Sequence, residues 1–309
     1  MKGQMDQMLH DRKDQYPLAQ ILIAKLIKER KPIGADIEEF LAAMKACDRI
    51  SQTYHQILDC PTCYFQAEDS IIKNNFTVIT DVEPVFFSQM PLADLREYTF
   101  EPLQTKNRFY EYGDEEFLSV ADNEIVNILR TASKETPEFL TLGRSRKWHN
   151  EIALRNVRWP FELVPSRSPE RYEWQTTFIW GLKSLPHTVI LSFQATRSPA
   201  PIMRGELLSI LSVTWWKNKL IFGTVHKFIP ILLISIRTGS FRTCEAFYTG
   251  SKFVLRYSKP VPMNFTEPIE DRVKAFDWVI QWLLSTPLGD TQNLESAISM
   301  GRRVSSRPR

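Results

Sequence analysis

Apolar residues recur at helical spacing in two runs near the start of the chain, over residues 17–30 and 36–58. Pro32 and Gly34 lie between the runs and interrupt the helical pattern. The apolar positions are Leu18, Ile21, Leu22, Leu26 and Ile27 in the first run, and Ile37, Phe40, Leu41, Met44, Cys47, Ile50, Tyr54 and Leu58 in the second. The pattern predicts an antiparallel helical hairpin over residues 1–60.

The middle of the chain has a weaker pattern. Residues 61–120 are irregular and contain several prolines, and within them residues 76–80 are typical of a strand. Apolar residues at helical spacing predict a helix at 120–134, with Ile125, Ile128 and Leu129 on its buried side. A second helix is predicted at 170–184, where Phe178 and Leu182 would be buried.

Later in the chain, short continuous apolar runs at residues 188–193 and 230–236 are rich in β-branched residues. Such runs are typical of central strands that are covered on both faces. A helix is predicted between them at 204–217. Residues 241–248 and 253–258 flank a loop that contains Gly250, and glycine tolerates the positive φ that a tight loop requires. We therefore expect a β-hairpin in which Glu245 lies opposite Arg256.

A last helix is predicted from about Thr266, and it ends before Pro287. Residues 289–309 have no apolar period and carry four arginines, so a disordered basic tail is expected. The sequence therefore predicts an α+β fold with three parts. These are a helical hairpin (1–60), an α+β body (61–288) with a mixed sheet and flanking helices, and the tail (289–309).

Composition limits the function classes. The net charge is +3, and without the four arginines of the last eight residues it is about −1, so the body is not a basic nucleic-acid binder. The polar start of the chain lacks the apolar core of a secretory signal, and no uninterrupted apolar stretch is long enough to span a bilayer. Four cysteines in 309 residues fit a reducing compartment. We expect an intracellular protein, in the cytoplasm or the nucleus, with no membrane segment.

The spacing of the glycines and histidines excludes several sites in their standard form. The closest pair of glycines, Gly239 and Gly250, is eleven positions apart. Phosphate-binding loops, dinucleotide-binding turns and the nucleophile elbow each need two glycines within about six positions. The five histidines are also far apart, so no pair lies at the helical spacing of a zinc protease. The sequence therefore predicts no cofactor and assigns no catalytic residue.

Cys60 and Cys63 have the spacing of a redox dithiol or of half a zinc site. A redox pair of this kind opens a helix after a strand, whereas this pair follows the long predicted helix. A zinc site would need two further ligands close by. We interpret the pair as thiols without a metal or redox role.

Glu206 and Glu245 are the candidate carboxylates for metal-dependent catalysis. The order of a helix with Glu206, a strand and a hairpin with Glu245 is similar to the restriction-endonuclease-like nuclease core. Such a core needs clustered carboxylates around a divalent metal and a lysine two residues beyond one of them. Glu245 is followed by Ala246 and Phe247, so the motif is incomplete. Glu245 is better interpreted as half of a cross-strand ion pair.

Residues 144–174 combine basic and aromatic side chains, which single-stranded nucleic acid or a phosphorylated partner could contact. The candidate contacts are Arg144, Arg146, Trp148, Arg155, Arg158 and Trp159. Interspersed glutamates reduce the positive field. The preferred interpretation is a solvated connection whose aromatic residues anchor it to the core.

Residues 230–236, 242–248 and 253–259 together resemble a pattern in uncharacterised proteins of filamentous ascomycete fungi, over the last third of the chain. The resemblance implies no activity. Three hypotheses follow from the sequence. The first is a non-catalytic interaction protein that contacts a protein partner or a second copy through its N-terminal helices. The second is a hydrolase or metal-dependent nuclease without a standard motif. The third is a binder of an anionic partner through residues 144–174.

Overall fold

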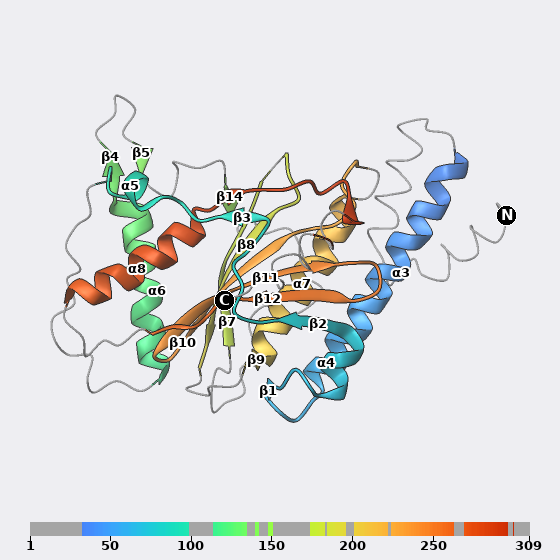
Figure 1. The fold of residues 1–309 in the computed structure, drawn as a ribbon, viewed down its shortest axis with the longest axis horizontal. Coiled ribbons are helices and arrows are strands. Elements are labelled where there is room, and N and C mark those ends of the chain that lie inside the picture. Colours follow the sequence, from blue (N-terminus) through green and yellow to red (C-terminus); the bar gives the residue numbers. More distant parts are fainter. Residues whose placement is uncertain are drawn as a thin grey trace.

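The structure is a computed structural model in which helices surround one large sheet (Figure 1). It describes residues 33–98, 114–134, 140–141, 148–150, 174–182, 184–195, 201–221, 224–262, 269–295 and 299. The helices are α3 (Ile33–Leu58), α4 (Ser70–Asn75), α5 (Leu92–Leu95), α6 (Asp114–Thr131), α7 (Arg204–Ile221) and α8 (Ile269–Leu283). The strands are β1 (Tyr64–Phe65), β2 (Phe76–Ile79), β3 (Phe87–Ser88), β4 (Ser133–Lys134), β5 (Leu140–Thr141), β6 (His149–Asn150), β7 (Trp174–Gly181), β8 (Thr188–Gln194), β9 (Ile202–Met203), β10 (Ile231–Arg237), β11 (Ser240–Tyr248), β12 (Phe253–Tyr257), β13 (Val261–Pro262) and β14 (Thr286–Pro287).

The large sheet has eight strands in the order β2-β12-β11-β10-β8-β7-β6, with β13 paired to β11. Strands β8 and β10 are parallel and are connected through α7, and β12 is parallel to β2. The other pairs in this sheet are antiparallel. Three further pairs, β1 with β9, β3 with β14 and β4 with β5, form small separate sheets. The predicted mixed α+β class is confirmed.

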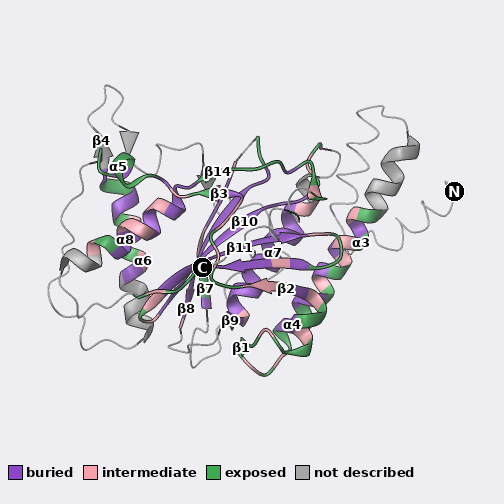
Figure 2. Ribbon diagram, in the orientation of Figure 1, coloured by how far each residue is buried: buried purple, intermediate pink, exposed green. Residues whose placement is uncertain are grey.

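Helices cover both faces of the sheet, and the central strands are buried between them (Figures 1 and 2). Helices α3 and α7 lie on one face, and α6 and α8 lie on the other. Strand β10 shows why the central strands are apolar throughout. Its residues Leu232, Ile234 and Ile236 face α6 and α8, while Ile231 and Leu233 face α7. Because successive side chains point to opposite faces, a strand covered on both sides is apolar on both faces, and in β10 only Ser235 and Arg237 depart from this pattern.

Helix α3 packs along α7 through its apolar stripe. The predicted positions Met44, Cys47, Ile50 and Tyr54 are buried, whereas Leu58 is exposed and its neighbour Ile57 is buried in its place. The other predicted helix of the hairpin, over residues 17–30, lies outside the described residues. Among the helices that the structure describes, none has the length and apolar character needed to cross a membrane.

The β11–β12 hairpin has the predicted register. Glu245 lies opposite Arg256, Ala246 opposite Leu255 and Tyr248 opposite Phe253. Gly250 in the loop has a φ of +85°, which side chains other than glycine adopt only with strain. Loop length and apolar alternation therefore suffice to set this pairing.

The helix predicted over residues 170–184 is wrong, because residues 174–181 form strand β7. The segment contains Thr176, Thr177 and Ile179, whose β-branched side chains favour strands over helices. Strand β7 is buried at both ends, and its pairing with β8 shifts register between Thr176 and Phe178. An apolar run of this length fits either periodicity, and the β-branched composition is the better guide.

The predicted disordered tail was expected to begin at residue 289, but residues just after this point still pack on the body. Thr291 is buried, and its backbone carbonyl accepts a hydrogen bond of 2.8 Å from the amide of Lys227. The ring of His226 is hydrogen-bonded through Nδ1 to Oγ1 of Thr291, at 2.6 Å. Short-range apolar periodicity does not reveal such contacts with a distant loop. Residues 301–309 lie outside the described residues.

His187 anchors the chain that leaves α8. Its Nε2 donates to the carbonyl of Leu288 at 2.9 Å, and its ring packs edge-on against Phe87 with 5.3 Å between ring centroids. Burial lowers the pKa of His187 from 6.5 to about 4, against the opposing effect of the Leu288 carbonyl. The imidazole is therefore neutral at pH 7.

Candidate functional site

The carboxyl ends of the parallel strands β8 and β10 meet at one edge of the sheet, beside the start of α7. Gln194 ends β8 and Arg237 ends β10, and the two residues are register partners. Glu206 lies in the first turn of α7. In open sheets of this kind, ligands bind outside the carboxyl ends of parallel strands. This edge is therefore the expected position of a catalytic site.

The carboxylate of Glu206 is fully buried at this edge and lies between two arginines. Arg237 Nη2 donates to Oε1 at 2.9 Å, and Arg242 Nη2 donates to Oε2 at 2.8 Å. Ser235 adds a hydrogen bond of 2.6 Å to Oε1. Burial alone would raise the pKa of Glu206, but Arg237, Arg242 and the Ser235 hydroxyl lower it to about 2. Glu206 is therefore ionised at pH 7.

Two further donors complete the surroundings of Glu206. The backbone amide of Met203 lies 3.1 Å from Oε2, and the Tyr257 hydroxyl donates to the same oxygen at 3.3 Å. The guanidinium of Arg242 also stacks on the ring of Tyr257, with Cζ 4.0 Å from the ring centroid. Both carboxylate oxygens thus accept several hydrogen bonds, and a metal ion could bind only by displacing these donors.

Among the described residues, Trp174 and Gln194 pack beside Glu206 against Gly205. A Cβ atom on Gly205, in the first turn of α7, would lie 2.4 Å from Cγ of Trp174 and 2.5 Å from Oε1 of Gln194. Trp174 and Gln194 are both buried, and the amide of Gln194 donates to the hydroxyl of Ser192 at 2.9 Å. The described groups at this edge therefore pack on one another.

Glu245 is also fully buried, but it faces the opposite side of β11. Its carboxylate accepts hydrogen bonds from the backbone amides of Val85, at 2.9 and 3.0 Å, and Phe86, at 2.6 Å. The predicted ion pair is present, with 3.2 Å between Arg256 Nε and Glu245 Oε2. Burial nevertheless outweighs these contacts and raises the pKa of Glu245 to about 7. The pair fastens residues 83–86 to the sheet, because Arg256 also donates to the carbonyl of Glu83 at 3.0 Å.

The structure does not bring the four candidate metal ligands together. Glu206 and Glu245 face different sides of the sheet, and Cys60 and Cys63 follow the end of α3. Among the described residues, no three His, Cys, Asp or Glu side chains are grouped closely enough to hold a metal ion. Cys60 is half-buried and Cys63 is exposed, and both are thiols. Their carbonyl groups accept hydrogen bonds from Arg204, which connects this turn to the start of α7.

The basic and aromatic segment is described only at its ends. Trp148 is buried, and its Nε1 donates to the carbonyl of Ser285 at 3.0 Å. In this structure Trp148 is therefore a core residue whose ring is not accessible for a base to stack on. Arg144, Arg146, Arg155, Arg158 and Trp159 lie outside the described residues.

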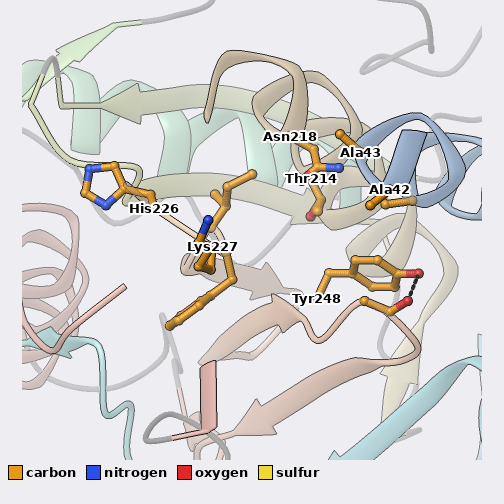
Figure 3. Close-up of a pocket in the computed structure, with 11 residues that line it drawn as sticks. Ala42, Ala43, Thr214, Asn218, His226, Lys227 and Tyr248 are labelled. Atoms are coloured by element: carbon orange, nitrogen blue, oxygen red, sulfur yellow. Dashed lines mark hydrogen bonds between the residues drawn. The ribbon is translucent and has the colours of Figure 1, made fainter. Parts of the chain in front are cut away.

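A pocket of about 290 Å³ lies between α3, α7 and the β11–β12 hairpin (Figure 3). The side of the pocket that α3 forms is lined by the small residues Ala42, Ala43 and Ala46. Thr214 and Asn218 come from α7, and Tyr248 comes from the end of β11. Lys227 and Phe228, in the segment before β10, complete the lining, although the ring of Phe228 packs against Phe86 and Phe247 on the other face of the sheet.

Comparisons of the chain with models of protein families, with curated proteins and with solved structures find no match.

The sequence did not indicate the partners of Glu206 or the pocket. Ser235 and Arg237 interrupt an apolar strand at alternate positions, which places them on one face. The two-residue turn at Thr238 and Gly239 then brings Arg242 opposite Ser235. Polar residues at alternate positions of this strand could therefore have indicated a buried polar cluster. No sequence pattern could have indicated the pocket, because its walls come from four separate segments.

Proposed function

We propose that the protein is a non-catalytic intracellular interaction protein. The proposal is supported by the hydrogen bonds to the carboxylate of Glu206, which lies at the edge of the sheet where a catalytic site is expected. Two arginines, two hydroxyl groups and a backbone amide occupy the carboxylate oxygens. A general base or a metal ligand needs an accessible lone pair. Glu206 instead stabilises the packing of α7 against strands β10, β11 and β12 of the sheet.

The proposed partner is a protein chain, contacted through the N-terminal helices, and a second copy of this chain would be one case. The apolar stripe of α3 is already buried against α7. Its outward face carries the exposed residues Lys45, Arg49 and Gln52. A partner would therefore contact this polar face together with the apolar positions of residues 17–30. An intracellular location, in the cytoplasm or nucleus, is supported by the four cysteines, which are all thiols.

An activity assay tests the non-catalytic part of the proposal. Purified protein is incubated with single- and double-stranded DNA and RNA in the presence of Mg²⁺ or Mn²⁺, and with generic ester substrates. No turnover above that of the Glu206→Gln variant is expected. Metal-dependent cleavage that disappears in Glu206→Gln, while the variant stays folded, would instead support the nuclease alternative.

Light scattering and cross-linking test the partner surface. The double variant Leu22→Asp and Leu26→Asp should lose any self-association or captured partner, because charges would disrupt the predicted apolar face. Gln66→Asp and Gln292→Asp, at exposed residues outside the N-terminal helices, are the matched control for added charge. Equal partner binding by wild type and the leucine variant would refute this surface. Tight binding to single-stranded DNA that weakens steeply with salt would favour the anionic-partner hypothesis.

A further inference from the structure

We propose that the pocket between α3, α7 and the β11–β12 hairpin binds a small aromatic monocarboxylate. The proposal goes beyond the interaction function, since it concerns a small-molecule site lined by residues of α3, α7 and the β11–β12 hairpin. Its volume of about 290 Å³ is close to the lower end of known small-molecule pockets, about 300 Å³.

The shape of the pocket favours a flat apolar group. Along α3, the wall consists of the methyl groups of Ala42, Ala43 and Ala46, so a ring can approach the helix closely. Across the pocket from the alanines, the buried residue Tyr248 contributes an aromatic ring to the lining. The Tyr248 ring is held in place by its hydroxyl, which donates to the carbonyl of Gly250 at 3.0 Å, and by the Phe253 ring at 4.9 Å. A fixed aromatic wall facing small side chains is complementary to a planar ligand.

The charges favour an anion. Lys227 and His226 line the pocket, and its lining includes no Asp or Glu side chain. Burial raises the pKa of Tyr248, so its phenol stays neutral and adds no negative charge at pH 7. Lys227 is exposed, and its side chain lies to one side of Tyr248 in the pocket lining (Figure 3). A carboxylate at the opening would be close to this cation while its ring fills the interior.

The polar groups inside the pocket indicate a single charge and not a phosphate. Asn218 is the one side-chain amide in the lining, and its Nδ2 makes a weak contact of 3.8 Å with the sulfur of Cys47. The hydroxyl of Thr214 donates its proton to the carbonyl of Ile210 at 2.7 Å, so it does not donate to a ligand in the pocket. A phosphate is usually held by several donors, such as an arginine fork or successive backbone amides. One lysine and one amide match the two oxygens of a carboxylate better.

The test uses phenylacetate as the probe and phenylacetamide as its uncharged match, with the full-length protein. Saturation-transfer NMR and chemical-shift titration at low salt give the dissociation constants. The expected constant for phenylacetate is on the order of 1 mM, as fits a ligand of this size. Phenylacetamide should bind about fivefold more weakly, because one exposed charge contributes modestly in water.

Two variants and their controls locate the site. Ala43→Leu adds three carbon atoms to the pocket wall and should abolish binding, whereas Gln52→Leu on the exposed face of α3 should not change it. Lys227→Met should remove the preference for phenylacetate over phenylacetamide, and Lys259→Met, at another exposed lysine, should retain it. Lys227→Met keeps the test valid if Ala43→Leu does not fold.

Three results would overturn the proposal. The first is no detectable binding of phenylacetate at 10 mM, far above the constant expected on the order of 1 mM. The second is binding that persists unchanged in a folded Ala43→Leu variant. The third is equal affinity for the acid and the amide in the wild type, which would remove the charge argument.

Discussion

The two buried glutamates of the sheet differ in how their charge is balanced. Glu206 has two arginines and a pKa of about 2, whereas Glu245 has one arginine and a pKa of about 7. Both are fully buried, so burial penalises both charges. The second arginine and the hydroxyl donors therefore decide the difference. Burial of a carboxylate does not by itself indicate an active site, since the number of cations around it sets whether it can gain or lose a proton at pH 7.

The largest expected effect comes from removing the charge of Glu206. Glu206→Gln leaves Arg237 and Arg242 buried without their shared counterion. Breaking a buried ion pair on one side costs about 3–5 kcal/mol of the free energy of unfolding. Urea unfolding at pH 7 measures this loss, with Glu245→Gln as the matched control, for which a smaller loss is expected because that carboxyl is already partly protonated. A loss below about 1 kcal/mol for Glu206→Gln would contradict the comparison.

The second effect is a dependence of stability on pH. In the folded protein Glu245 keeps its proton to about pH 7, whereas its ordinary pKa is 4.5, so stability is lost as the pH rises from 4.5 to 7. His187 acts in the opposite direction. Its pKa falls from 6.5 to about 4, so stability is present above pH 6.5 and is lost as the pH falls toward 4. Each shift corresponds to about 3 kcal/mol, and the two nearly cancel in the wild type.

Single variants separate these two contributions. Relative to the wild type, Glu245→Gln should gain stability with rising pH between 4.5 and 6.5, because the His187 contribution is then unopposed. His187→Gln, whose amide can still donate to Leu288, should lose stability over the same range. Unfolding free energies at pH 4.5, 5.5 and 6.5 measure both slopes. Parallel curves for the wild type and both variants would show that neither group has the assigned pKa.

A third prediction concerns the packing beside Glu206. Gly205→Ala places a methyl group within 2.5 Å of Trp174 and Gln194. Overpacking of this kind costs about 1–3 kcal/mol. Gly250→Ala is the control with a strained backbone but open space around the new atom, and about 1 kcal/mol is expected there. A stabilised Gly205→Ala variant would show that the edge has room that the structure does not show.

The smallest effect is expected at an exposed ion pair. Arg96 Nη2 lies 2.7 Å from Asp277 Oδ2, but the arginine side chain is 55% exposed. Pairs in this environment contribute about 0–1 kcal/mol. Arg96→Ala should therefore change the free energy of unfolding far less than Glu206→Gln, and thermal unfolding at two salt concentrations checks it. A loss as large as that of Glu206→Gln would contradict the role assigned to burial.

The sequence predicted what depends on local pattern. The Glu245 and Arg256 pairing followed from the loop around Gly250 and the alternation of the two strands. Strand β7 was missed because its apolar residues fit a helical period equally well over so short a run. The surroundings of Glu206 could not be predicted in full, since Arg242 and Tyr257 reach it only through the order of three strands. Long-range register, and not composition, determines that cluster.

The most direct test of the account is the titration of the wild type with Mn²⁺ by isothermal calorimetry, with Glu206→Gln as the reference. Since Arg237, Arg242 and Ser235 occupy the carboxylate, no saturable binding that depends on Glu206 is predicted. Stoichiometric Mn²⁺ binding by the wild type that is lost in a folded Glu206→Gln variant would contradict it. The edge of the sheet would then be a metal site, and the protein a candidate enzyme.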